Sequence, residues 1–547
     1  LNAGALGDIT IEGDVGATDA ALGAITIVGA DQVLFDETVT AASFTQDAAA
    51  ATGLTTFDGL VDLSGNLTFT GQSLSFNGSG VAGNTVGGTM TVENAGTFTT
   101  ADNADFSVTG FFTQLGAGHS VLGADLTSDA SINFNTNITI TSSDLVTITT
   151  GGADTEDLTI GGSITSTADE SLTLDAGEFG DVDLDGVINL GTGNFTVVDA
   201  AVVDVANTLS AGVFTQSDGT TSTTLNDILD LSGNFDFTGQ ALTLNAQLDS
   251  DGSVEVSNAS AFTTAAGGDI IADLGFTQNG AGSNSLAGDI TTTDSNIGFA
   301  TAVTLTGPVA MTTGGGSTSA GNITFSSTVD SDATARTLGL TVGTGNIDFD
   351  GAVGGTQALA AVTISALNVN VDAGLSTNNG DIDFTGVTGA TVLAGAIATG
   401  GGDFIGAGTD FTNTGTITTN GGAVNLNGQT GDINIDANIT TGGGTAGIFT
   451  ATGASSFDSR GSTINTNDTT DSVSHGGGAI TVTTTTGDLF VGDLSSKGIF
   501  VNGLLGFLPG GTAAGVISLT SGGELVLAGS VDTRGGDGFI AGAAGDV

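Results

Sequence analysis

The sequence lacks several residue types that usually support a fold or a reaction. Its 547 residues include no cysteine, no tryptophan and no tyrosine, and only 2 prolines. Without cysteine, disulfides, thiolate metal sites and cysteine nucleophiles are all excluded. Packing and backbone hydrogen bonds must therefore hold the fold together.

Positive charge is also scarce. Only 4 residues are lysine or arginine against 59 aspartate and glutamate residues, which gives a formal net charge of -55. Binding to nucleic acid depends on lysine and arginine to neutralise phosphates, and binding to anionic membrane surfaces depends on the same residues. We therefore expect no nucleic-acid partner and no docking to an anionic bilayer.

Apolar residues are nevertheless abundant enough for a folded core. They make up 39% of the chain, and the mean hydropathy is +0.28, whereas disordered acidic chains have low hydropathy. The most apolar stretch, residues 499–508, is broken by Asn502, Gly503 and Gly506 and is too short to span a bilayer. We expect no membrane insertion within this chain. Neither end carries a recognisable start or stop signal, so we expect a segment of a longer protein.

A seven-residue phrase recurs along the chain and predicts short β-strands. It begins as Gly-Asp-Ile-Thr-Ile at residue 7 and returns at residues 180–186, 345–351, 380–386 and 431–437. Apolar and polar residues alternate in each copy, as in a strand with one buried face and one wet face. The residues expected to point inward are Ile9, Ile11, Val182, Leu184, Ile347, Phe349, Ile382, Phe384, Ile433 and Ile435.

The sequence also contains a duplication that is much longer than this phrase. Phe44-Thr45-Gln46 matches residues 214–216, an offset of 214 - 44 = 170, and the offsets of later matches shrink to 163. Deletions of this kind are tolerated in surface turns. We predict that residues 1–13 end a preceding block, that residues 14–186 and 187–351 are homologous blocks, and that residues 352–547 are diverged coils of one continuous solenoid.

Short strands with glycine-rich turns are compatible with a sandwich, a propeller or a solenoid. The solenoid is favoured because length changes between the two blocks leave the strand pattern intact, as expected where each coil contacts only its neighbours. The predicted fold class is all-β, a parallel β-helix solenoid forming an elongated rod, with coils of roughly 20 to 25 residues.

The phrase, the Thr/Asn/Gly-rich turns, the lack of cysteine and the weak repetition over the whole chain resemble filamentous-haemagglutinin-like repeats of large bacterial exoproteins and surface adhesins. The resemblance implies a right-handed β-helix, secretion to the cell surface, and a role as a stalk or adhesin shaft with a surface glycan or protein as receptor. The chain departs from that family in its acidity and in lacking an Asn-Pro-Asn-Gly secretion motif. The alternative is a subunit of a self-assembling extracellular filament or sheath, with homotypic contacts.

The strongest candidate for a chemical site is an alternating run of carboxylates. Asp181, Asp183 and Asp185 precede Gly186 with the spacing of the first half of a calcium loop, and Asn346, Asp348 and Asp350 repeat it. Such a loop normally ends in an acidic residue at its twelfth position, which here is Thr192. The alternative interpretation is a solvated face of a strand. We expect no required cofactor, with calcium as the candidate metal.

Catalysis is not expected. The minor alternative is a carbohydrate-active β-helix enzyme, since a glycosidase needs only a carboxylate pair. The aspartates, however, lie on a repeating phrase rather than in one non-repeating cluster. His119 and His475 are isolated in glycine-rich turns. Ice binding, a third possibility, requires regular outward threonine arrays, and the outward positions here mix threonine with aspartate, asparagine and serine.

Overall fold

The computed structural model is built almost entirely of short strands. It describes residues 1–17, 21–47, 53–78, 80, 83–142, 145–151, 155–314, 321–443, 446–468, 476–498, 500–501 and 510–535. In these ranges the strands run from β1 (Ile9–Ile11) to β68 (Val531–Asp532), and no helix occurs. No helix in the described ranges could therefore cross a membrane. The chain divides into two compact units, unit 1 (Leu1–Ile271) and unit 2 (Ala272–Val547).

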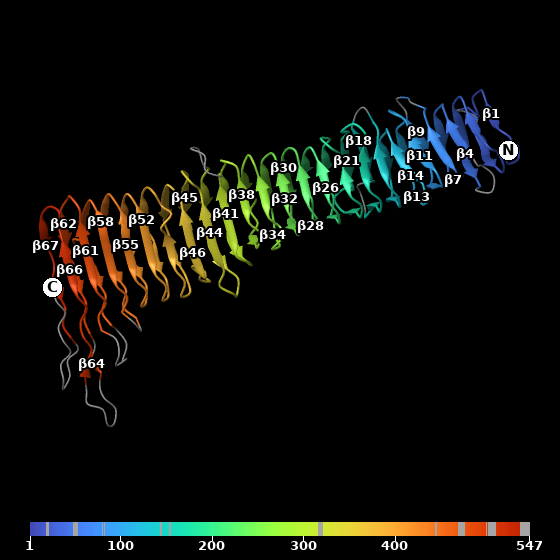
Figure 1. The fold of residues 1–547 in the computed structure, drawn as a ribbon. Coiled ribbons are helices and arrows are strands. Elements are labelled where there is room, and N and C mark those ends of the chain that lie inside the picture. Colours follow the sequence, from blue (N-terminus) through green and yellow to red (C-terminus); the bar gives the residue numbers. More distant parts are fainter. Residues whose placement is uncertain are drawn as a thin grey trace. The chain divides into compact units, whose positions relative to one another are not determined.

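Three strands make one turn of unit 1. β5 (Leu54–Phe57), β6 (Val61–Leu63) and β7 (Leu67–Gly71) are followed by β8 (Ser73–Phe76), which pairs with β5 in parallel. Within unit 1, every strand from β5 onward pairs with the strand three places later. Three parallel ladders form, which we call ladder A (from β5), ladder B (from β6) and ladder C (from β7). Figure 1 shows the strands of successive turns lying side by side within unit 1.

The register between turns gives the length of one turn. In ladder C, Leu67 pairs with Met90, a step of 23 residues, Phe112 pairs with Ile132, a step of 20, and Ile132 pairs with Leu158, a step of 26. The predicted parallel β-solenoid is confirmed, while the step of 26 residues exceeds the predicted turn length of roughly 20 to 25. The right-handed sense stays a prediction.

Unit 2 repeats the three-strand turn. One of its ladders, ladder D, contains β38 (Ile290–Thr292), β41 (Val309–Thr313), β44 (Thr337–Thr341) and β46 (Ala361–Ser365). A second, ladder E, contains β42 (Ile323–Phe325), β45 (Asn346–Phe349) and β47 (Asn368–Val371). All described strand pairs of this unit are parallel except β64 (Phe500–Val501) with β65 (Gly510–Gly511). The last turns are longer, with 489 - 457 = 32 residues separating Phe457 from its register partner Leu489.

Glycine at the corners is required because consecutive turns approach at hydrogen-bonding distance. A Cβ on Gly186, the last residue of one copy of the phrase, would lie 2.2 Å from the carbonyl oxygen of Gly162 in the preceding turn. A Cβ on Gly180, the first residue of that copy, would lie 2.1 Å from the carbonyl oxygen of Glu156. Side chains cannot fit at such distances, which explains the glycines at both ends of this copy.

The core is a dry interior in which like residues of successive turns lie over one another. Of the ten residues expected to point inward, the eight from Val182 to Ile435 are at most 1% exposed. Ile9 and Ile11 are only half-buried, because β1 pairs with β3 (Val33–Phe35) on one side. Phenylalanine rings stack between turns, with 4.9 Å between the ring centroids of Phe35 and Phe57. Burial of such side chains contributes roughly 1.5–3 kcal/mol each.

The duplicated phrases fall on strands that are 23 places apart. Phe-Thr-Gln ends β4 (Val39–Gln46) and forms β27 (Phe214–Gln216), and Leu-Ser-Gly-Asn begins at the ends of β6 and of β29 (Leu229–Leu231). Since 23 is not a multiple of three, matched strands occupy different ladders. β6 belongs to ladder B and β29 to ladder A. The same residue pattern therefore fits different sides of unit 1. The boundaries of the sequence blocks stay predictions.

Replacing a stacked phenylalanine should destabilise the solenoid. The ring of Phe57 is fully buried and stacks on both Phe35 and Phe76, with centroids 4.9 Å and 5.0 Å away. We expect Phe57→Ala to lower the free energy of unfolding by about 3–5 kcal/mol, measured as a shift of the urea midpoint. The matched control is Phe111→Ala, because Phe111 is 56% exposed and its loss should change stability by less than about 0.5 kcal/mol. Equal effects of the two variants would contradict the assignment of the core.

Candidate functional site

The first predicted metal triplet lies along an extended strand. Asp183 is the outward residue of β22 (Val182–Leu184), and Asp181 and Asp185 flank that strand. Outward residues two positions apart on a strand are about 6.6 Å apart, so these carboxylates are spread along a line rather than curled around one point. Thr192 donates its backbone N–H to Asp169 Oδ1 at 3.0 Å. The prediction of calcium binding by the triplet stays a prediction.

Asp181 has a structural role that the sequence interpretation missed. Its Oδ1 accepts the backbone N–H of Val202 in the following turn at 3.1 Å, while its own N–H donates to Asp157 Oδ1 in the preceding turn at 3.1 Å. The acidic residue that opens a strand thus joins three successive turns. Other residues that accept a backbone N–H from the following turn in this way include Asp105, Asp125, Asn137, Asn296, Asn322, Asp381, Asp403 and Asp410.

The outward side of β22 nevertheless concentrates negative charge. Asp157, Asp181, Asp183 and Asp204 line a depression of about 230 Å³, and Asp183 and Asp204 are directly in register. Partial burial raises the pKa of Asp183 above its ordinary value, and the carboxylates of Asp185 and Asp204 raise it further. Burial and Asp157 likewise raise the pKa of Asp181, an effect that the hydrogen bond from Val202 opposes. The fold holds these like charges close together.

The second predicted triplet is partly brought together. In the described ranges, the group of acidic side chains with one oxygen from each within 4.8 Å of the others consists of Asp348, Asp350 and Asp372. Asp372 follows β47 in the next turn, and sequence spacing gave no sign of it. Asn346 instead accepts a 2.8 Å hydrogen bond from Asn368 Nδ2. Three exposed or half-exposed carboxylates could supply only part of the six to eight oxygens that calcium takes.

The few cations are all paired with aspartate. Arg336 contacts Asp332 at 2.8 Å, Arg460 contacts Asp458 at 2.5 Å, and Lys497 contacts Asp532 at 2.7 Å. Arg534 contacts Asp532 as well, at 2.8 Å, and the Arg534 and Lys497 side chains hold the pKa of that carboxyl well below its usual range. Each cation thus contacts a carboxylate, and Lys497 and Arg534 share that of Asp532.

The glutamine of the Phe-Thr-Gln triplet is a further residue whose role the sequence interpretation missed. Gln114 is fully buried, and its Nε2 donates to Asn94 Oδ1 at 2.7 Å and to the carbonyl oxygen of Gly118 at 3.1 Å. Its Oε1 accepts the hydroxyl of Thr136 at 3.0 Å. The recurrence of the triplet in the sequence could have pointed to this residue. Its role is to provide hydrogen-bond partners for buried backbone carbonyl groups at a corner. The prediction that His119 lies in a turn is wrong, because it is an exposed residue at the start of β14 (His119–Leu122), and His475 lies outside the described residues.

Comparison with models of protein families, with curated proteins and with solved structures found no match to this chain.

Removing one turn-joining carboxylate should be more damaging than neutralising it. Asp403 Oδ1 accepts the N–H of Ala423 at 2.7 Å, while the Asp403 N–H donates to Asp381 Oδ1 at 2.8 Å. Asp403→Ala leaves the Ala423 donor without this acceptor, and we expect it to lower the free energy of unfolding by about 1 kcal/mol. Asp403→Asn keeps an acceptor oxygen and should have a smaller effect in the same urea titration. The role assigned to this side chain is wrong if asparagine destabilises as much as alanine.

Stability should rise on mild acidification. Burial raises the pKa of several carboxyls in the folded state, so folding binds protons, and lowering the pH from 7 toward about 4 favours the fold. These carboxyls are Asp125, Asp181, Asp183, Asp199 and Asp236. For other carboxyls the folded pKa is lowered, so the stability they contribute is lost as the pH falls further. These are Glu170, Asp332, Asp458, Asp493 and Asp532.

The measurement is the Tm as a function of pH by circular dichroism, with a maximum expected near pH 4. Added NaCl should raise the Tm more at pH 7 than at pH 4, because salt screens the repulsion between ionised carboxylates. A Tm that falls steadily between pH 7 and pH 4, or that ignores salt at pH 7, would contradict this account.

Proposed function

We propose that this chain is a structural segment of a large extracellular or cell-surface protein, where it acts as a stalk or as the shaft of an adhesin. The observation that carries the proposal is the unbroken succession of parallel turns within each unit. In unit 1, ladder A extends by pairing from β1 through β3 and β5 to β32. These twelve strands, joined by eleven steps of about 4.8 Å, span roughly 50 Å.

The stacking gives each turn a mechanical role. Every turn contacts mainly the turns before and after it, through backbone hydrogen bonds and stacked apolar side chains. A solenoid of this kind is a spacer whose length grows with the number of turns. The acidic coat, with 59 carboxylates against 4 cations, supports solubility and opposes sideways aggregation.

Catalysis, a required cofactor and nucleic-acid binding are not part of the proposal. Carboxylates that resemble a catalytic or metal-binding run join turns or lie along a strand face, as Asp181 and Asp183 do. Residues 1–335 contain no lysine or arginine with which to bind phosphates. Calcium or magnesium would act on this chain chiefly by screening its charge.

Negative-stain microscopy of the purified chain tests the proposal. We expect rods on the order of 100–130 Å long whose length does not change with protein concentration. Rods that lengthen with concentration would support the alternative of a self-assembling filament instead. Globular particles would overturn the stalk proposal.

A further inference from the structure

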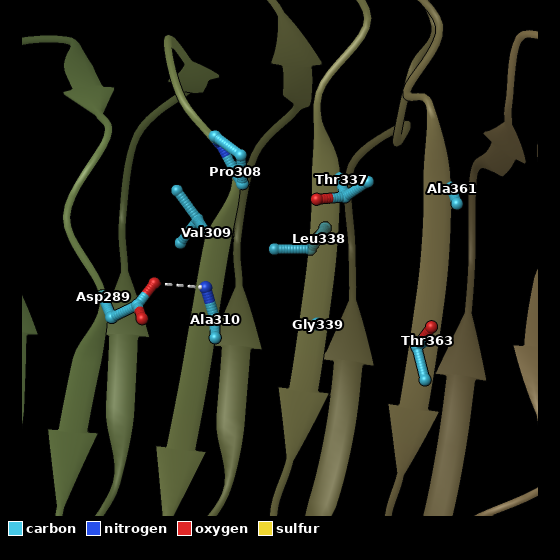
Figure 2. Close-up of a pocket in the computed structure, with 9 residues that line it drawn as sticks. All are labelled: Asp289, Pro308, Val309, Ala310, Thr337, Leu338, Gly339, Ala361 and Thr363. Carbon is cyan, nitrogen blue, oxygen red and sulfur yellow. Dashed lines mark hydrogen bonds between the residues drawn. The ribbon is translucent and has the colours of Figure 1, made fainter. Parts of the chain in front are cut away.

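The outward side of ladder D contains a hollow that the recurring seven-residue phrase did not predict. Its volume is about 360 Å³, and Ala310 on β41 and Gly339 on β44 form its floor. Asp289 lies at one end and Thr363 on β46 at the other, while Pro308 and Thr337 lie along one side, as Figure 2 shows. Ala310, Gly339 and Thr363 are in register on three successive strands.

A related surface earlier in the chain has the same row of register positions, with larger side chains at the two middle positions. There β18 (Val146–Thr149), β21 (Leu172–Asp175) and β24 (Phe195–Val197) place Thr147, Thr173 and Thr196 in register. Asp125 precedes them in the ladder, and its Oδ1 accepts the Thr147 N–H at 2.7 Å.

The row beside Asp289 keeps both ends of this arrangement but lacks its two middle threonines. Asp289 Oδ1 accepts the Ala310 N–H at 2.7 Å, as Asp125 does for Thr147, and Thr363 stands where Thr196 stands. The two threonines between them are replaced by Ala310 and Gly339. A Cβ added to Gly339 would have no atom within 4 Å. Two adjacent threonines are thus absent from the floor of the hollow. Its rim differs as well, because Pro308, Thr337 and Ala361 stand where the earlier row has Leu145, Ser171 and Asn194.

The chemistry of the hollow fits an uncharged polyhydroxyl ring. The Asp289 carboxylate accepts hydrogen bonds, and the hydroxyls of Thr337 and Thr363 can donate and accept them. The Pro308 ring and the Ala310 methyl offer apolar contact to C–H groups. A volume of about 360 Å³ is at the lower end of the range of small-molecule sites.

The charges around the hollow disfavour anionic and cationic ligands. The nearest cation in sequence, Arg336, is already held by Asp332 through two hydrogen bonds of 2.8 and 2.9 Å, and the negative charge of Asp289 would repel an anionic sugar. An ammonium or guanidinium group could contact Asp289 but would leave most of the floor and the two threonine hydroxyls unused.

We propose that this hollow is a binding site for a single neutral sugar unit of a surface glycan. The inference rests on the proposed function, since it adds a contact point to an adhesin shaft. The hollow is open and has no aromatic side chain against which a sugar could stack, so the dissociation constant for one sugar should be on the order of 1 mM. Useful attachment would then require many copies of the chain acting together.

The test uses saturation-transfer NMR with the full chain and a panel of neutral methyl glycosides: the glucoside, galactoside, mannoside and N-acetylglucosaminide. We expect at least one of them to receive saturation from the unmodified protein. Ala310→Thr with Gly339→Thr places threonines where the earlier row has them, and this double variant should weaken binding at least tenfold. Asp289→Asn should weaken it as well.

The matched control is Gly298→Thr. Gly298 is the outward residue of β39 (Ile297–Phe299) in ladder E, outside the hollow, and a Cβ there also has no atom within 4 Å. This variant should bind the glycoside as the unmodified protein does, and both threonine variants should keep the original Tm.

The proposal is overturned if no glycoside receives saturation, or if the double threonine variant binds as well as the Gly298 variant. Saturation of N-acetyl-lysine amide in place of every glycoside would overturn it too, in favour of a cationic partner. None of these outcomes affects the negative-stain measurement, so failure of the site and failure of the stalk proposal can be told apart.

Discussion

The parallel stacking of turns at hydrogen-bonding distance is the constraint on which the other features depend. A separation of about 4.8 Å leaves no room for a Cβ at the corners, and so Gly180 and Gly186 frame a strand. The same separation places each inward residue directly over its equivalent, so that Phe35, Phe57 and Phe76 form a continuous stack. It also brings outward carboxylates such as Asp183 and Asp204 into register. The close stacking of turns thus causes both the stabilising contacts of the core and the repulsion between outward carboxylates.

Much of the fold could be predicted from the sequence because the period of two is a local signal. Residues such as Val182 and Leu184 alternate with aspartates, and their burial follows from that alternation alone. The division into three ladders could not be predicted in this way. Which strand pairs with which depends on the number of strands between them, and all three ladders use the same strand pattern.

The candidate site was harder to predict for a related reason. Spacing along the chain placed Asp348 and Asp350 near one another, but Asp372 joins them only because the next turn lies alongside. The role of Asp181 likewise depends on Val202, which is 21 residues away. Spacing within a short phrase cannot distinguish a carboxylate that binds an ion from one that accepts an N–H from a neighbouring turn. Three-dimensional neighbours decide between these roles.

The 23-strand interval between matched phrases also bears on how such a chain can lengthen. Seven full turns and two strands carry a repeated residue to a different side, as the step from β6 to β29 illustrates. An inserted block of strands therefore need not contain a whole number of turns, because a repeated strand can pair in any of the three ladders. Selection can extend the molecule freely in this way. A recognition feature such as the hollow beside Asp289 must then arise by local divergence rather than by copying.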